Sequence, residues 1–238
     1  MFSSRNLLPL VAIAGLAFTA SPAFADAVTL TSADINKSFD LSYNGFSDGT
    51  TVSGLTATST FTLTAVAGNS YTFSYSVANT TSNPVDSRVS GFAFNTNPDV
   101  TGASSTGTFA IAATGGNYPN SIGSVDACFR AAGGSCAGGG GGGLTDGQTG
   151  TGSFTLTFAS PVTSLTLSDF YVRYQSISGA GNITSATGSG TLTSTGGSTG
   201  GQVPEPGMLG LLGAAAGVTM LLRRRRRRAV AQPALALA

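Results

Sequence analysis

The sequence contains no histidine, no tryptophan and a single glutamate, and only 9% of its 238 residues are charged. Without histidine the chain lacks the commonest general base, which excludes Ser-His-Asp triads and Cys-His nucleophiles. It has only two cysteines, so thiolates and imidazoles cannot complete a zinc or iron site. We therefore expect no catalytic residue, no metal site and no cofactor.

Positive charge is also scarce in the body of the chain. Between residues 26 and 203, nine aspartates stand against one lysine and three arginines, a net charge of about −5. A nucleic-acid binder needs a basic face, so nucleic acid is excluded as a partner. What the chain has in abundance is serine and threonine, 62 together, and glycine, 34. This composition favours β-structure, turns and flexible segments over long helices.

The N-terminus has the features of a secretory signal peptide, residues 1–25. Arg5 and the free amine form a short positive region, and residues 7–20 form an apolar core. Ala23 and Ala25 match the small-x-small pattern of signal peptidase sites. We expect cleavage after Ala25 and export of the body; an ordinary buried helix is the alternative.

A second apolar run lies near the C-terminus and directly precedes six arginines. Residues 207–222 carry no charge, and a helix of that length covers about 24 Å of a hydrocarbon layer about 30 Å thick. Arginine side chains can reach the interface and local thinning can absorb the difference, which permits one transmembrane helix. Clustered arginines stay on the cytoplasmic side, so the body lies outside; a buried helix with a solvated basic tail is the alternative. The cluster consists of Arg223, Arg224, Arg225, Arg226, Arg227 and Arg228.

A short proline-rich segment, Val203, Pro204, Glu205 and Pro206, stands before the apolar run. Its two prolines forbid helix and hold one carboxylate in an extended, accessible segment at the outer membrane boundary. This tripeptide, followed by an apolar helix and an arginine cluster, resembles the PEP-CTERM sorting signal of Gram-negative bacteria, here residues 204–228. The short tail 229–238 departs from that pattern, because such proteins usually end soon after the basic cluster.

The resemblance implies a partner and a location. The partner is exosortase, a polytopic membrane protease or transpeptidase, and cleavage falls at or near the tripeptide. Members of the family commonly accompany extracellular polysaccharide production. The protein is then anchored in the inner membrane with a periplasmic body before processing, and lies at the cell surface or outside afterwards.

The body, residues 26–185, is expected to be an all-β, antiparallel β-sandwich of jelly-roll type. Several runs alternate apolar and hydroxyl residues with period two, as half-buried strands do. The apolar members are Leu55, Ala57, Phe61, Leu63 and Ala65; Tyr71, Phe73, Tyr75 and Val77; and Phe154, Leu156 and Phe158. In a further run the apolar parity changes between Leu167 and Phe170, so a bulge or turn near Asp169 is needed.

Residues 186–203 consist almost entirely of glycine, serine and threonine. Such a composition is typical of a flexible coil. We expect a linker that holds the body off the membrane and exposes the tripeptide to a protease.

Two cysteines in an exported chain, Cys128 and Cys136, are expected to form one disulfide that closes a small loop. The glycine run 138–143 invites comparison with a phosphate-binding loop. No Lys-Ser or Lys-Thr follows it, so a surface loop pinned by the disulfide is favoured.

Four aspartates near expected strand ends, Asp86, Asp99, Asp126 and Asp169, leave two alternatives open. A pair of them could serve a hydrolase, or a few could bind calcium, although turn aspartates usually bond local backbone. Aromatic side chains could stack on sugar rings, although most lie in the alternating runs and are expected in the core. They are Tyr43, Tyr71, Tyr75, Tyr118, Tyr171 and Tyr174.

The body also resembles a subgroup of PEP-CTERM proteins, the cistern family, over about residues 30–185. The resemblance rests on "SFDLSYNGF", "SRVSGFAFNTNPDV", "CFRAAGGSC" and "VRYQSISG". It implies paired cysteines and no known activity. The sequence thus predicts an exported, non-enzymatic surface or matrix protein with a structural or adhesive role linked to exopolysaccharide; a carbohydrate-binding module and an aspartate-dependent hydrolase are the alternatives.

Overall fold

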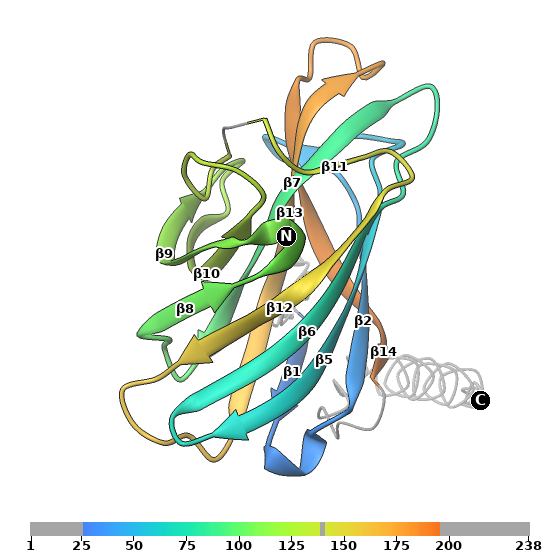
Figure 1. Ribbon diagram of the computed structural model, residues 1–238. Helices are drawn as coiled ribbons and strands as arrows, with labels where there is room; N and C mark the ends of the chain where they lie inside the picture. The colour runs from blue at the N-terminus through green and yellow to red at the C-terminus, as the bar shows by residue number, and fades with distance from the viewer. Residues whose placement is uncertain (1–25, 139–140, 196–238) are drawn as a thin grey trace, which may run out of the picture.

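The computed structural model describes residues 26–138 and 141–195, which form an antiparallel all-β structure (Figure 1). This confirms that the body is all-β and antiparallel, as predicted. Its strands are β1 (Ala27–Leu30), β2 (Ser38–Tyr43), β3 (Phe46–Ser47), β4 (Thr50–Thr51), β5 (Ala57–Ala67), β6 (Ser70–Asn79), β7 (Asp86–Asn97), β8 (Gly102–Ser105), β9 (Ile111–Tyr118), β10 (Gly123–Arg130), β11 (Leu144–Thr145), β12 (Thr149–Thr157), β13 (Leu165–Ser178) and β14 (Ser185–Thr195). Two 3-10 turns accompany them, η1 (Ser32–Asp34) and η2 (Gly107–Phe109).

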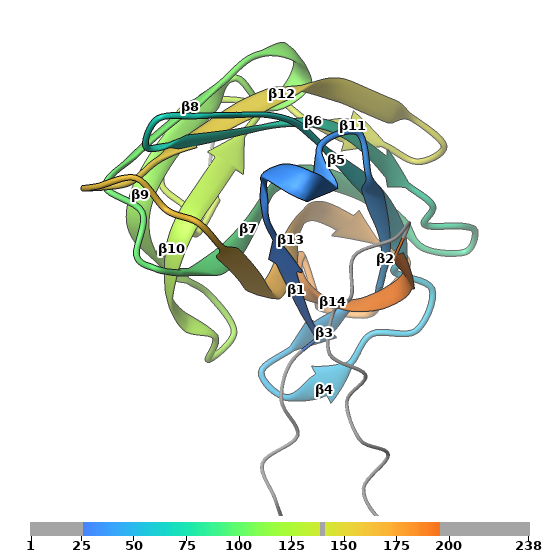
Figure 2. The same cartoon turned by 90° about the horizontal axis from the view of Figure 1, so that it is seen from below.

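The main strands form one continuous sheet in the order β8-β12-β6-β5-β2-β14-β13-β7-β10-β9. Seen end-on, the sheet curls until it nearly closes on itself (Figure 2), and its edge strands β8 and β9 lie against each other. β14 is shared between the two walls, because it pairs with β13 through its first half and with β2 through its second. The two expected sheets are therefore continuous through one strand that passes from wall to wall.

The interior is filled mainly by phenylalanine and tyrosine rings from the alternating strands. Phe61 lies near its middle, with its ring centroid 5.4 to 6.4 Å from five other phenylalanine rings. The predicted core positions are buried on β5, β6 and β12, with one exception. Ala65 is exposed, because a register shift between Leu63 and Ala65 reverses the alternation near the end of β5.

The predicted irregularity near Asp169 is present in β13. Asp169 has a φ of 53°, and the register against β7 shifts between Ser168 and Tyr171. Leu167 and Phe170 are consequently both buried although their sequence parity differs. The bulge keeps a single face of the long strand on the core.

The flexible linker predicted for residues 186–203 is wrong for its first part, because residues 186–195 belong to β14. Small residues are needed there for packing. A Cβ added to Gly188 would lie 2.5 Å from the carbonyl oxygen of Asn44 and 2.6 Å from Cγ2 of Val172. Glycine therefore allows close approach of backbone and side chains where β14 crosses between the walls.

In residues 26–138 and 141–195, no helical segment has both the length and the apolar character that a membrane span requires. The predicted span, residues 207–222, lies outside the described residues, as do the signal peptide 1–25 and the tail 229–238.

Candidate functional site

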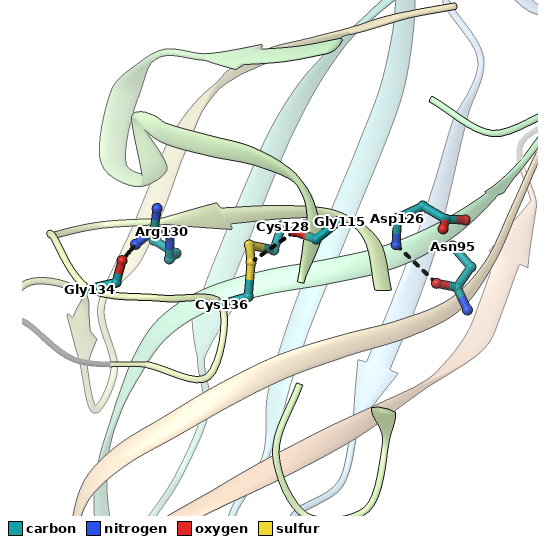
Figure 3. The surroundings of a disulfide bond; sticks show 7 residues. All are labelled: Asn95, Gly115, Asp126, Cys128, Arg130, Gly134 and Cys136. Atoms are coloured by element: carbon teal, nitrogen blue, oxygen red, sulfur yellow. Dashed lines mark hydrogen bonds between the residues drawn. A yellow bond between two sulfur atoms is a disulfide. The ribbon is translucent and has the colours of Figure 1, made fainter. Parts of the chain in front are cut away.

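The disulfide predicted between Cys128 and Cys136 is present, with the two Cα atoms 6.0 Å apart. Cys128 lies on β10 and Cys136 in the loop that follows it, and both are buried. The bond ties this loop back onto the sheet (Figure 3). The loop segment 131–138 is called the disulfide loop below.

Arginine side chains fasten the disulfide loop and its continuation to the sheet. Arg130 donates to the carbonyl oxygen of Gly134, as Figure 3 shows, and Arg88 donates to that of Gly142. Arg173 Nε donates to the carbonyl oxygen of Ala137 at 2.8 Å. These are the three arginines of the described residues, so the arginines of an otherwise acidic body gather around one loop.

Arg173 is the most buried of these arginines, with 7% of its surface exposed. It projects from β13 and donates a second hydrogen bond, of 2.7 Å, to the carbonyl oxygen of Ala186. Burial lowers the pKa of the guanidinium, and the nearby Tyr118 opposes that effect. Arg173 was not predicted as a site residue, because alternation with Val172 and Tyr174 predicts a solvated side chain on the outer face of the strand. In the structure the disulfide loop accepts a hydrogen bond from it instead.

A separate open groove of ≈ 390 Å³ lies beside β2, β5 and β14. Its lining consists mainly of hydroxyl-bearing and small residues, together with Val52 and Leu55, which are buried. The hydroxyl-bearing side chains are Ser42, Tyr43, Thr51, Ser53, Thr56, Thr58, Thr80, Ser189 and Thr191. No charged residue lines this groove, so it suits a neutral, hydrogen-bonding ligand.

The four candidate aspartates do not gather into a metal site. Among residues 26–138 and 141–195, no group of three or more His, Cys, Asp or Glu side chains is placed to hold a metal ion. Asp126 accepts from the backbone N–H of Thr96, and Asp169 accepts from the amide of Asn95. Asp86 accepts from the Ser178 hydroxyl. These bonds join neighbouring strands and not the local backbone of a turn, so the three aspartates fasten strand to strand.

The tyrosines mostly occupy the core, as the alternating pattern predicts. Tyr171 is partly exposed, and the other five are buried, with at most 3% of their surface exposed. Tyr171 packs against Tyr118, with the ring centroids 5.8 Å apart. An exposed platform of stacked tyrosines for sugar rings is therefore not formed by these six side chains.

The outer face of the wall formed by β5, β6 and β12 carries hydroxyl groups in place of charges. Neighbouring hydroxyls bond across these strands, for example Thr72 with Thr155 at 3.0 Å and Ser70 with Thr157 at 3.4 Å. Lysine, arginine and carboxylate side chains are absent from the strand residues of this face on β5, β6 and β12. We call this surface the hydroxyl face.

The candidate targeting residues lie outside the residues that the structure describes, and their roles stay predictions. They are Ala23 and Ala25 at the signal-peptide cleavage site, Val203, Pro204, Glu205 and Pro206 of the sorting motif, and Arg223, Arg224, Arg225, Arg226, Arg227 and Arg228 of the basic cluster.

Comparison with protein-family models, with curated proteins and with solved structures found no match for this chain. Fold class and site chemistry therefore define it as an all-β protein with a disulfide-closed loop held by arginines.

Proposed function

We propose that the protein is an exported, exosortase-processed component of the cell surface or extracellular matrix, with a structural or adhesive role linked to exopolysaccharide. The observation that carries the proposal is the order of features in residues 203–228: a proline-flanked glutamate, an uncharged run and six arginines. The run anchors the protein in the inner membrane before processing. The arginines keep the C-terminus inside, and the body lies in the periplasm.

The hydroxyl face supports a structural or adhesive role for the body. A neutral polysaccharide offers hydroxyl groups, and a neutral hydroxyl surface can exchange hydrogen bonds with it directly or through water. The absence of histidine favours a role other than catalysis. Within this proposal the body has a jelly-roll-like strand topology and belongs to the cistern subgroup.

Cell fractionation tests the proposal. The protein is expressed in a Gram-negative bacterium that makes exopolysaccharide, with and without its exosortase gene. We expect the body in the extracellular or surface fraction when exosortase is present, and in the inner membrane when the gene is deleted. The same distribution in both strains would contradict the proposal.

A carbohydrate-binding module is the second candidate, favoured by the open groove of ≈ 390 Å³ with its hydroxyl lining. A glycan array of neutral polysaccharides discriminates between the candidates. Binding that is lost in Thr58→Val, which removes a hydroxyl at the groove with little change in side-chain shape, supports the module. Absence of binding to every polysaccharide of the host removes it.

A further inference from the structure

A small cavity lies between the disulfide loop and the sheet. Its volume is ≈ 10 Å³, about the least that one buried water-sized species needs. The polar side chains that matter for its chemistry are Tyr118, Arg130 and Arg173, which line it together with both cysteines and Gly138. The cavity is distinct from the open groove beside β2 and β14.

Two polar atoms of residues that line this cavity are buried and have no hydrogen-bond partner. They are the hydroxyl of Tyr118, whose residue is 2% exposed, and Nε of Arg130. An unsatisfied buried donor costs about 1 to 3 kcal/mol. Such groups in a native structure therefore call for a partner, and the cavity offers the space for it.

The charge around the cavity is positive. Arg173 is buried, and its two hydrogen bonds go to the neutral carbonyl groups of Ala137 and Ala186. Within residues 26–138 and 141–195, no carboxylate lies within ion-pair distance of Arg130 or Arg173. No carboxylate lines the cavity either. A buried guanidinium without a counter-charge is costly, so an anion stabilises this arrangement.

The Tyr118 hydroxyl and the guanidinium groups of Arg130 and Arg173 can all donate hydrogen bonds. Guanidinium groups have no acceptor. Burial raises the pKa of Tyr118 well above its ordinary value, so the phenol keeps its proton and can donate. Tyr118 and Arg173 line the same small cavity.

We propose that this cavity binds one small monoatomic anion, a halide such as chloride, held by the Tyr118 hydroxyl, Arg130 Nε and the Arg173 guanidinium. The halide supplies the missing acceptor and the missing negative charge in a space that excludes a phosphate or sulfate ion. It thereby fixes the disulfide loop to β13. Halide binding is independent of exosortase processing, so either proposal can fail without the other.

Bromide replacement locates the anion directly. The full-length protein is crystallised in detergent with sodium bromide, and anomalous scattering is recorded at the bromine edge. We expect one peak within hydrogen-bond distance of the Tyr118 hydroxyl and the Arg173 guanidinium. An occupied cavity without an anomalous peak means that it holds water, and it overturns the proposal, as does an empty cavity.

Halide-dependent stability gives a second measurement in solution. The thermal midpoint of the full-length protein is compared in bromide and in gluconate at equal ionic strength. At a halide concentration about ten times the dissociation constant, we expect the midpoint to be about 3 °C higher in bromide. Equal midpoints over a concentration series up to the molar range would contradict the proposal.

Two tyrosines provide a matched pair of variants. Tyr118 and Tyr174 are both buried with unpartnered hydroxyls, but only Tyr118 lines the cavity. We expect Tyr118→Phe to lose at least half of the bromide-dependent shift and Tyr174→Phe to keep it. Equal loss in both variants would show that the shift reports general salt effects.

Discussion

At the scale of single residues, the buried polar side chains of the described residues are few, and their partners are specific. Asn79 shows this on β6: it is fully buried, and its amide donates to the carbonyl oxygen of Leu144 and to the carboxylate of Asp146, each at 3.1 Å. Its side-chain oxygen accepts from the N–H of Thr81. One side chain thus joins the end of β6 to the segment 144–146, which is far away in the sequence, and also bonds the backbone two residues after it.

Replacing Asn79 by alanine is expected to lower the free energy of unfolding by about 3 kcal/mol, because buried acceptors lose their donor. Urea unfolding of the exported body measures the change. Asn182→Ala is the control: Asn182 is exposed, and its replacement is expected to change stability by less than about 0.5 kcal/mol. Equal changes in the free energy of unfolding in the two variants would contradict a stabilising role for the hydrogen bonds of Asn79.

The disulfide gives a second prediction at the residue scale. Reduction, or the double replacement Cys128→Ala with Cys136→Ala, opens a short loop whose closure restricts the unfolded chain. We expect a loss of about 2 to 3 kcal/mol in the free energy of unfolding. Urea unfolding with and without reductant measures it, and coincident transitions would contradict the expectation.

At the scale of elements, the sequence predicted the strands with alternating composition and the bulge near Asp169. Both depend on local chemistry, because side chains of a half-buried strand alternate and a change of parity needs an extra residue. It mispredicted β14, whose composition is that of a linker. β14 pairs locally with the preceding strand β13, but its pairing with β2 is long-range, and glycine in β14 reflects close packing that no local pattern reveals.

Gly188 tests the packing role of glycine in β14. We expect Gly188→Ala to destabilise the body by about 1 to 3 kcal/mol, because the added methyl group meets the backbone of Asn44 and the side chain of Val172. Gly133→Ala is the control, since a Cβ at Gly133 meets no atom within 4 Å. Thermal unfolding compares them. A harmless Gly188→Ala would mean that β14 is packed more loosely than described.

The candidate site was predictable only in part. The presence of two cysteines in a chain expected to be exported predicts the disulfide. The alternation of apolar and hydroxyl residues along the strands predicts that most tyrosines are buried. The gathering of Arg88, Arg130 and Arg173 around one loop depends on the fold, since these residues lie on three different strands. Their spacing along the chain carries no signal of it.

At the scale of the whole molecule, one curled sheet encloses an aromatic core and presents mainly uncharged polar surface on one wall. Four of the six tyrosines contribute to that interior, and Tyr118 is buried in a smaller cluster with the two cysteines. The acidic body has its arginines concentrated at one loop. The three arginines of the described residues thus serve to hold one loop and its continuation against the sheet.

Burial of tyrosines makes the whole fold sensitive to alkali. Burial raises the pKa of Tyr43, Tyr118 and Tyr174 above the ordinary value near 10. The unfolded chain therefore loses these protons first, and the stability that they contribute is present below about pH 10 and lost as pH rises further. We expect a fall of about 4 kcal/mol per pH unit from three such groups.

Thermal or urea unfolding at constant ionic strength between pH 8 and 12 measures this effect. Tyr174→Phe is expected to make the decline less steep, by about 1.4 kcal/mol per pH unit. A midpoint that stays constant across this range would show that the three phenols do not have raised pKa values.

The central claim is that residues 203–228 direct processing by exosortase, and the intact mass of the mature extracellular protein tests it most directly. In a host with exosortase we expect a mass that lacks the apolar run and the six arginines. We also expect Glu205→Ala, with Pro204→Ala and Pro206→Ala, to leave the precursor uncut in the membrane. A mature extracellular protein that still ends at Ala238, or an unchanged mass in the triple variant, would contradict the claim.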